Sequence, residues 1–392
     1  MNHESSYTCP VFGKCGGCQL LGKPYEKQLQ EKKQYLESLF PGETVEEVLG
    51  MEDPVGYRCK VQRIFEFRKG QVIAGNYEAH SHRLVPVDFC LLEDPDCDAI
   101  LNDIQLLVKK FHLPVYDPIR RQGVLRYVLI RKGKYTGQLL VVLITAGFAF
   151  PGKKNFVKAL ISQHPEITSI VQNLNTRTDS LILGSKNEVL YGRGYIVDEL
   201  MGKQFRISAS AFYQVNPAQT VHLYKTALEM TDLKGKSVLD AYCGTGTIGI
   251  LASDYAKEVV GVEINPEAVT DAIYNAKANQ VSNIRFIRKD ASEYLLGDHV
   301  PDVVLMDPPR SGSTPAFLDA IATAGVKEIV YISCGPETLA RDLVYLKQKG
   351  YEVKRIKPVD LFPFTSHVET VCCLYHQKKD FISVPYEPKD VK

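Results

Sequence analysis

The sequence lacks three features that would point to particular classes of protein: an excess of one charge, a signal-peptide-like start and a membrane-length apolar run. Its 47 basic and 46 acidic residues give a formal net charge of +1, so any nucleic-acid-binding surface has to be a local patch. The first residues carry no apolar stretch of the signal-peptide type, and no run approaches the roughly 18 apolar residues of a membrane span. With 392 residues, 45% of them hydrophobic, the sequence predicts a soluble cytoplasmic protein of two or three domains.

Ten cysteines are present, and three of them lie close together near the N-terminus. Cys9, Cys15 and Cys18 surround a pair of glycines, which permit turns in which backbone amides point at the sulfurs of a cluster. Without a secretion signal, such cysteines indicate metal binding or catalysis rather than disulfides. Cys90 is the leading candidate for a fourth ligand, with Cys97 as the alternative. Four thiolates suit either a zinc ion or a [4Fe–4S] cluster, and the spacing alone does not distinguish them.

The chain divides into segments with different secondary-structure patterns. Residues 23–40 have the spacing of an amphipathic surface helix. Basic and aromatic side chains interleave over residues 57–69, a mixture that can contact phosphates and stack on bases, although a solvated strand face explains it equally well. We predict three parts: residues 1–50 with the cysteine loop and helix, an α+β domain over 51–205 with the fourth ligand, and a Rossmann-like α/β domain over 206–392.

The α/β part begins with a strand-like segment, residues 237–240, followed by the glycine-rich loop 242–247. The next predicted strand ends in Glu263, whose carboxylate could accept both ribose hydroxyls of a nucleoside held by the loop. A glycine-rich loop by itself would also suit a dinucleotide. Two further strand ends favour S-adenosylmethionine instead: Asp290, which could meet the adenine, and Asp307-Pro-Pro-Arg310, which places a carboxylate and a rigid turn beside the reacting centre.

A cysteine lies where such a fold opens a crevice for ligands. Ser333-Cys334-Gly335-Pro336 directly follows a short apolar strand-like run, and the carboxyl ends of strands in an open α/β sheet face the ligand crevice. A thiol at this position becomes a nucleophile if its environment favours the thiolate, whereas a lone cysteine is more often an inert core residue. The surrounding motifs favour the nucleophile.

Together these motifs resemble those of the RNA uridine-C5 methyltransferases, the bacterial family that methylates uracil C5 in 23S rRNA and in the tRNA T-loop. The resemblance covers nearly the whole chain and favours the 23S rRNA branch, because the tRNA-specific branch lacks the cysteine loop. The chain starts at the cysteines, without the extra RNA-binding β-barrel of many rRNA-specific members. The motifs are the loop Cys9/Cys15/Cys18, Phe212-Tyr-Gln214-Val-Asn216, Tyr242-Cys-Gly-Thr-Gly, Asp307-Pro-Pro-Arg310, Ser333-Cys334-Gly-Pro and His367-Val-Glu369.

The resemblance implies two bound groups and an RNA partner. It implies a [4Fe–4S] cluster on Cys9, Cys15 and Cys18 with Cys90 as fourth ligand, and RNA binding by the domain over 51–205. It further implies an S-adenosylmethionine site lined by Gln214, Tyr242, Thr247, Glu263, Asp290 and Asp307. Thr247 stands where some members of the family have asparagine. We expect a monomer.

The resemblance also implies a mechanism in which Cys334 adds to C6 of a flipped-out uracil and so makes C5 nucleophilic. Glu369 is the proposed general base that removes the C5 proton, and His367 orients its neighbours. Arg310 and Phe212 are candidate substrate contacts. The alternatives are a tRNA uridine-C5 methyltransferase and an iron–sulfur, dinucleotide-dependent oxidoreductase, although the latter would not explain the Ser-Cys-Gly-Pro and His-Val-Glu motifs.

Overall fold

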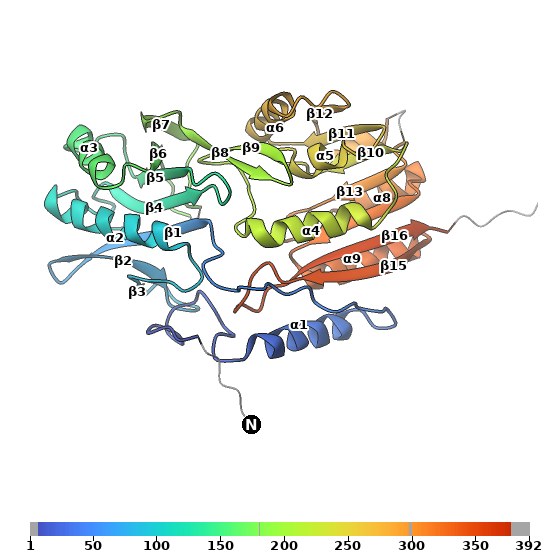
Figure 1. Ribbon diagram of the computed structural model, residues 1–392, viewed down its shortest axis with the longest axis horizontal. Coiled ribbons are helices and arrows are strands. Elements are labelled where there is room, and N and C mark those ends of the chain that lie inside the picture. The colour runs from blue at the N-terminus through green and yellow to red at the C-terminus, as the bar shows by residue number, and fades with distance from the viewer. Residues whose placement is uncertain (1–6, 180, 298–299, 378–392) are drawn as a thin grey trace, which may run out of the picture.

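The computed structural model describes residues 7–377 apart from 180 and 298–299, and in these residues two seven-stranded sheets stand side by side (Figure 1). A two-stranded sheet, β8 (Tyr195–Leu200) and β9 (Lys203–Ser208), lies between them in the sequence. No helix in the described residues combines the length and apolarity that crossing a membrane requires.

The first large sheet has the strand order β3-β2-β1-β4-β5-β6-β7 and is antiparallel except for the β5–β6 pair. Two helices cover one of its faces and enclose a core with it, α2 (Pro95–Lys110) and α3 (Lys153–Gln163). Asp94 caps the first turn of α2 by accepting a hydrogen bond from the Asp96 amide, and Pro95 occupies the first helical position, where no amide is needed. The strands are β1 (Lys60–Arg68), β2 (Gln71–Tyr77), β3 (Leu84–Pro86), β4 (Leu125–Lys132), β5 (Leu139–Thr145), β6 (Ile167–Leu174) and β7 (Lys186–Tyr191).

The second large sheet has the order β12-β11-β10-β13-β14-β16-β15, with β16 antiparallel to both neighbours. The parallel strands run outward from β10 in both directions, so the sheet has its topological switch point beside β10, where open α/β sheets bind ligands. This is the Rossmann-like α/β fold that the sequence predicted. The strands are β10 (Ser237–Ala241), β11 (Glu258–Glu263), β12 (Ile284–Arg288), β13 (Val303–Met306), β14 (Glu328–Ser333), β15 (Tyr351–Val359) and β16 (Glu369–His376).

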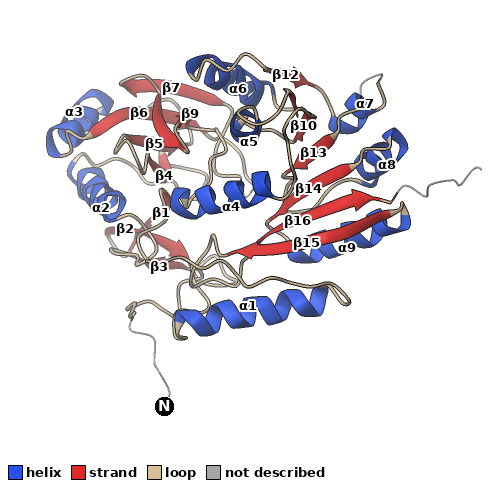
Figure 2. Cartoon of the chain, turned by 45° about the vertical axis from the view of Figure 1, so that its right-hand side comes forward, coloured by secondary structure: helices blue, strands red, loops and turns tan. Residues whose placement is uncertain are grey.

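Helices cover both faces of this second sheet and enclose one core on each side (Figure 2). One face carries α4 (Pro217–Glu229), α5 (Thr247–Ala252) and α6 (Pro266–Ala278). The other face carries α7 (Ala291–Leu295), α8 (Pro315–Ala324) and α9 (Pro336–Gln348).

The N-terminal helix α1 (Tyr25–Leu39) packs against the second sheet, although it is far from that sheet in the sequence (Figure 1). Leu36 is buried in the same core as α8 and α9, and Val45 and Leu49 form isolated bridges with β15. The helix is present where the sequence predicted it. It is amphipathic as predicted, but its buried face includes the polar Gln28 and Lys32 beside Leu36. The predicted division into three domains stays a prediction.

Candidate active site

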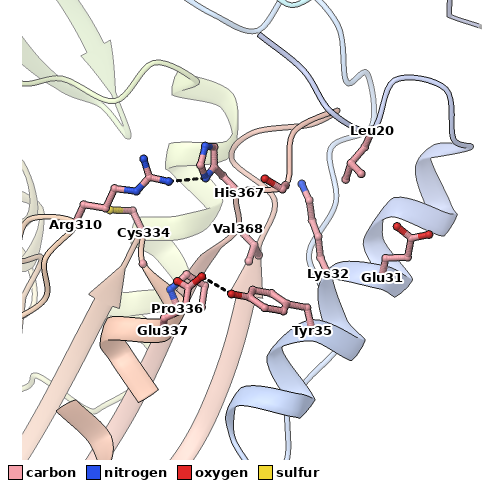
Figure 3. A pocket seen from close by; sticks show the side chains of 12 residues that line it. Leu20, Glu31, Lys32, Tyr35, Arg310, Cys334, Pro336, Glu337, His367 and Val368 are labelled. Carbon is pink, nitrogen blue, oxygen red and sulfur yellow. Dashed lines mark hydrogen bonds between the residues drawn. The ribbon is translucent and has the colours of Figure 1, made fainter. Parts of the chain in front are cut away.

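A pocket of about 490 Å³ opens beside Cys334, directly after β14 (Figure 3). Ser333 shapes the turn there, because its hydroxyl oxygen accepts a hydrogen bond from the Gly335 amide at 3.1 Å. Four parts of the chain enclose the pocket: the N-terminal segment, the loop after β13, the β14–α9 turn, and the loop that leads into β16. The lining residues are Leu20, Glu31, Lys32, Tyr35, Arg310, Cys334, Gly335, Pro336, Glu337, Ser366, His367 and Val368.

The sheet register brings Glu369 next to Cys334. Ser333 stands opposite Thr370 in the antiparallel β14–β16 ladder. Cys334, which follows Ser333, and Glu369, which precedes Thr370, are therefore also neighbours. The Glu369 side chain is buried, with only 2% of its surface exposed. Burial, followed by the nearby charge of Asp307, raises the pKa of Glu369 to about 8.

The Cys334 thiol is half-buried in an environment that disfavours the thiolate. Burial and the negative charges of Glu369 and Asp307 raise the pKa of Cys334 to about 11, and Arg310 opposes them. In the absence of ligands the sulfur is therefore protonated at neutral pH. A nucleophilic role requires the thiolate to be favoured when substrate and cofactor bind.

Arg310 and His367 meet at the mouth of the pocket (Figure 3). A guanidinium nitrogen of Arg310 donates to Nδ1 of His367 at 3.0 Å. Burial and the neighbouring Arg310 lower the pKa of His367, so the imidazole is neutral and its Nδ1 is an acceptor. This geometry fits the predicted orienting role of His367 better than a role as base.

Three of the six residues predicted for the cofactor site lie at the carboxyl ends of β10, β11 and β12. Tyr242 follows β10 with a left-handed φ of 62°, and its hydroxyl is 3.2 Å from that of Ser313. The Glu263 carboxylate accepts hydrogen bonds from the amides of Gly244 (3.2 Å) and Asn265 (2.8 Å) and so ties the glycine loop to the end of β11. Asp290 is exposed after β12 and caps α7, and hydrogen bonds from Ser292 lower its pKa.

The remaining three lie nearer to Cys334 or to α5. Asp307 follows β13, and burial raises its pKa to about 7. The Gln214 side chain is hydrogen-bonded to the buried Tyr224, and Thr247 is the first residue of α5, with its hydroxyl 3.3 Å from that of Thr245. Of the two predicted substrate contacts, Arg310 lines the pocket. Phe212, with 65% of its surface exposed, does not line it.

Sequence reasoning missed the α1 side of the pocket. Lys32 and Tyr35 line it, and the Tyr35 hydroxyl is hydrogen-bonded to the Glu337 carboxylate at the start of α9 (Figure 3). The available signal was the four-residue spacing of Gln28, Lys32 and Leu36, which puts two polar side chains on the same helix face as a core leucine. Polar residues on a buried face indicate specific partners.

The predicted metal ligands gather in one region without forming a closed site. Cys9, Cys18 and Cys90 pack against the small apolar cluster of Leu21, Tyr57, Leu92 and Phe364. Burial and then the charges of Cys9 and Cys15 raise the pKa of Cys18 to about 11. These thiols have the donor chemistry of a thiolate-bound metal or cluster, but nowhere in the described residues do three Cys, His, Asp or Glu side chains converge closely enough to hold a metal ion. Cys97, the alternative fourth ligand, is in the core beneath α2 instead.

The interleaved basic residues of β1 are less available to phosphates than their sequence suggested. Arg63 is only 1% exposed, and its guanidinium donates to Glu93 and Asp98 at 2.8 Å each. Arg68 is paired with Glu66. Arg63 therefore fits neither of the two alternatives, phosphate contact or a solvated strand face, because it is buried and two carboxylates satisfy its charge.

The comparisons with known proteins agree on one family. Residues 168–378 match the family described as tRNA (uracil-5-)-methyltransferase. An uncharacterised RNA methyltransferase of Halalkalibacterium halodurans is 42% identical over 93% of this chain and 82% of its own length, and one of Clostridium tetani is 40% identical over 95% and 83%. Among solved structures, the Pyrococcus abyssi tRNA (uracil-54, C5)-methyltransferase in complex with S-adenosyl-L-homocysteine is similar, with a TM-score of 0.77 and 26% identity over 94% of this chain and 87% of that one.

Proposed function

Since the chain belongs to the RNA uracil-5 methyltransferase family and is an S-adenosylmethionine-dependent enzyme acting on RNA, we propose that it methylates uracil C5 in 23S rRNA through a covalent Cys334 adduct. The observation that carries the proposal is the pairing of Cys334 with Glu369 where β14 and β16 meet the pocket. The two residues sit where a nucleophile and a base could act on opposite ends of one C5–C6 bond.

Cys334 and Glu369 carry the chemical steps. The Cys334 thiol loses its proton to solvent when substrate binds, and the thiolate adds to C6 of the uracil; the S–C6 bond that forms leaves carbanion character at C5. S-adenosylmethionine supplies the methyl group that C5 takes, with S-adenosylhomocysteine as the leaving group. Glu369 then removes the C5 proton, the electron pair re-forms the C5–C6 double bond, and the S–C6 bond breaks to release the cysteine.

The electrostatics of the pocket suit these roles. With a pKa of about 8, a deprotonated Glu369 is a stronger base than an exposed carboxylate and works near neutral pH. Arg310 is the neighbour that lowers the pKa of Cys334, so we assign it to stabilise the thiolate and to contact the substrate. Phe212, with its exposed ring, is assigned to stack on a neighbouring base.

The S-adenosylmethionine site is assigned to the loop ends beside β10. Glu263 has acceptor capacity left for ribose hydroxyls after binding two amides, and Asp290 is exposed where an adenine could reach it. The other proposed contacts are Gln214, Tyr242, Thr247 and Asp307. Their positions around the switch point support this assignment.

The cysteine loop supports 23S rRNA as the substrate, because the resemblance drawn from the sequence associates this loop with the 23S rRNA branch. We propose that Cys9, Cys15, Cys18 and Cys90 hold a [4Fe–4S] cluster with a structural role, since the reaction needs no electron. tRNA is the second candidate substrate. It is favoured by the similarity to the P. abyssi enzyme, whose name specifies tRNA.

The substrate and the nucleophile can be tested together. Purified enzyme is incubated with labelled S-adenosylmethionine and either 23S rRNA or tRNA transcripts, and 5-methyluridine is mapped. We expect label in 23S rRNA with wild type and none with Cys334→Ala, because without the sulfur C5 is not nucleophilic. Cys373→Ala, at a core cysteine of β16 away from the pocket, is the matched control and should retain transfer. Methylation by Cys334→Ala would overturn the mechanism, and methylation of tRNA alone would overturn the substrate.

A further inference from the structure

The strap, residues 360–368, connects β15 to β16 and directly precedes Glu369. It contains no helix or strand, and three of its residues, Ser366, His367 and Val368, line the pocket beside Cys334. A segment without regular structure does not position its own side chains. The sheet fixes the backbone of Glu369, the first residue of β16, whereas the orientation of His367 and the path of the chain into Glu369 depend on the groups that hold the strap.

The N-terminal segment holds the backbone of the strap at Phe364. The amides of Gln19 and Leu20 donate to the Phe364 carbonyl at 3.0 and 2.9 Å, and the Gln28 side-chain oxygen accepts from the Phe364 amide at 3.1 Å. Phe364 has a left-handed φ of 65°, which is unfavourable for a residue of its size. Such a conformation persists only where surrounding contacts over-determine it.

A buried ion pair fixes the start of the strap to α1. The Lys32 ammonium is 2.7 Å from an Asp360 carboxylate oxygen, and their side chains are only 3% and 0% exposed. Lys32 also donates to the Phe362 carbonyl at 3.3 Å, and the Tyr25 hydroxyl donates to the other Asp360 oxygen at 3.0 Å. One helix thus binds the strap through both its backbone and its carboxylate.

The Lys32–Asp360 ion pair is better explained by its effect on the path of the strap than by a contribution to the free energy of unfolding. Taking two charges out of water costs about as much as their attraction returns, so an apolar pair of similar volume is often as stable. Directed bonds from Lys32 to Asp360 and Phe362, by contrast, define the path of the strap in a way that apolar contacts do not. Lys32 also borders the same pocket as Cys334 and His367.

We propose that Lys32 is a positioning residue for the methyl transfer: from α1, its bonds to the strap hold Glu369 and His367 against Cys334. The inference rests on the proposed function of Cys334 and Glu369. It gives the N-terminal segment, which carries the cysteine loop immediately before Gln19, an indirect role in the reaction through the position of the strap. Lys32 touches neither the reacting carbon nor the transferred group in this proposal.

The test separates formation of the covalent adduct from its resolution. The double variant Lys32→Met/Asp360→Asn removes both charges together, so that neither is left buried alone. RNA containing 5-fluorouridine at the target position forms an adduct whose C5 fluorine cannot leave as a proton does, so it reports formation alone. Unmodified RNA, quenched after single turnovers and run on denaturing gels, reports how long the adduct persists.

We expect the double variant to fold and to form the fluorinated adduct at close to the wild-type rate. The adduct on unmodified RNA should persist roughly tenfold longer or more, because a displaced base loses much of its rate. Lys33→Met is the control: Lys33 is on the same helix but pairs with the exposed Glu47, and it should match wild type. If the folded double variant has the adduct lifetime of wild type, the proposal is overturned. Equal slowing of adduct formation and adduct resolution would overturn it as well.

A milder variant keeps the proposal testable if the double variant does not fold. Tyr25→Phe removes only the hydroxyl bound to Asp360, and it should lengthen the adduct lifetime by a smaller, measurable factor. An unchanged lifetime in that variant would then count against the proposal. Failure of the proposed function is distinct, because it shows as methyl transfer or adduct formation by Cys334→Ala.

Discussion

At the scale of single residues, the site is defined by acidic groups that burial keeps from ionising easily. The pKa values of Asp240, Asp307 and Glu369 are raised to about 8, 7 and 8, in each case first of all by burial. The raised pKa values of Cys334 and Glu369 describe a ligand-free site in which both proposed reacting groups mostly hold a proton at neutral pH. Such an arrangement costs stability and suits acid–base chemistry near neutral pH.

Glu369→Gln should therefore have two opposite effects. In wild type the pKa of Glu369 is about 8 in the folded protein and near 4.5 in the unfolded chain. The free energy of unfolding therefore falls as pH rises from 4.5 to 8, and it stays at the lower value above pH 8. The amide removes that loss, and we expect the variant to be about 1–3 kcal/mol more stable than wild type at pH 8 and equal to it at pH 4. Chemical denaturation at both pH values measures the difference.

The same variant should accumulate the covalent RNA adduct, because the amide cannot take the C5 proton. A denaturing gel after incubation with substrate RNA and S-adenosylmethionine detects it. A variant that turns over normally, or that is less stable than wild type at pH 8, would contradict the assignment of Glu369 as a buried base. Gln71→Glu, on an exposed residue at the start of β2, adds a carboxylate outside the site and should leave both measurements unchanged.

At the scale of elements, the passage from β10 into α5 leaves no room for a side chain at Gly246 or Gly249. Gly246 has a left-handed φ of 79°, and a Cβ there would stand 2.6 Å from the Phe286 ring of β12. A Cβ on Gly249 would be 2.7 Å from an Asp240 oxygen that accepts the Gly249 amide. The glycines thus serve close packing of helix, loop and strand around the switch point, as well as the approach of a ligand.

Gly249→Ala should destabilise this turn by about 1–3 kcal/mol and weaken S-adenosylmethionine binding, because Asp240 is buried and has little room to move. Thermal unfolding and calorimetric titration with S-adenosylhomocysteine measure the two effects. Gly147→Ala is the matched control, since a Cβ there meets no atom within 4 Å, and it should leave affinity unchanged. Equal affinities in the two variants would show that the β10–α5 turn does not carry the cofactor site.

At the scale of the whole molecule, the N-terminal segment connects both large sheets. Its cysteine loop contacts β2, where the Gly16 amide donates to the Tyr77 carbonyl at 3.1 Å, while α1 packs on the second sheet. Between them, Gln19 and Leu20 bind the strap. Ligation of the cysteines would consequently tie the first sheet to the pocket wall.

This arrangement predicts which cysteines retain iron. After anaerobic purification we expect about four iron atoms per chain, lost in Cys18→Ser and Cys90→Ser. Cys97→Ala should keep its iron, because Cys97 is in the core beneath α2 and not with the other thiols. Elemental analysis of the iron and zinc content of each variant distinguishes these outcomes. Zinc in place of iron, or iron lost only with Cys97, would contradict the proposed ligand set.

The contiguous motifs were within reach of the sequence alone. The Rossmann-like part, the glycine loop, and Cys334 at a strand end could be predicted because strand periodicity and turn residues are local properties. Glu369 could be named through the resemblance. That it lies beside Cys334 follows from the β14–β16 register, which the sequence does not state.

The tertiary structure decided what each residue experiences. Arg63 could not be told from a phosphate-binding arginine until its two buried carboxylate partners were known, and Lys32 could not be told from a surface lysine until α1 was placed on the second sheet. The pKa values of Cys334 and Glu369 likewise depend on burial and on charges from other elements. Sequence by itself determined which chemical groups this protein possesses and where its strands and turns fall. Only the packing of distant segments decided which groups meet, because desolvation and charge–charge contact act through space and not along the chain.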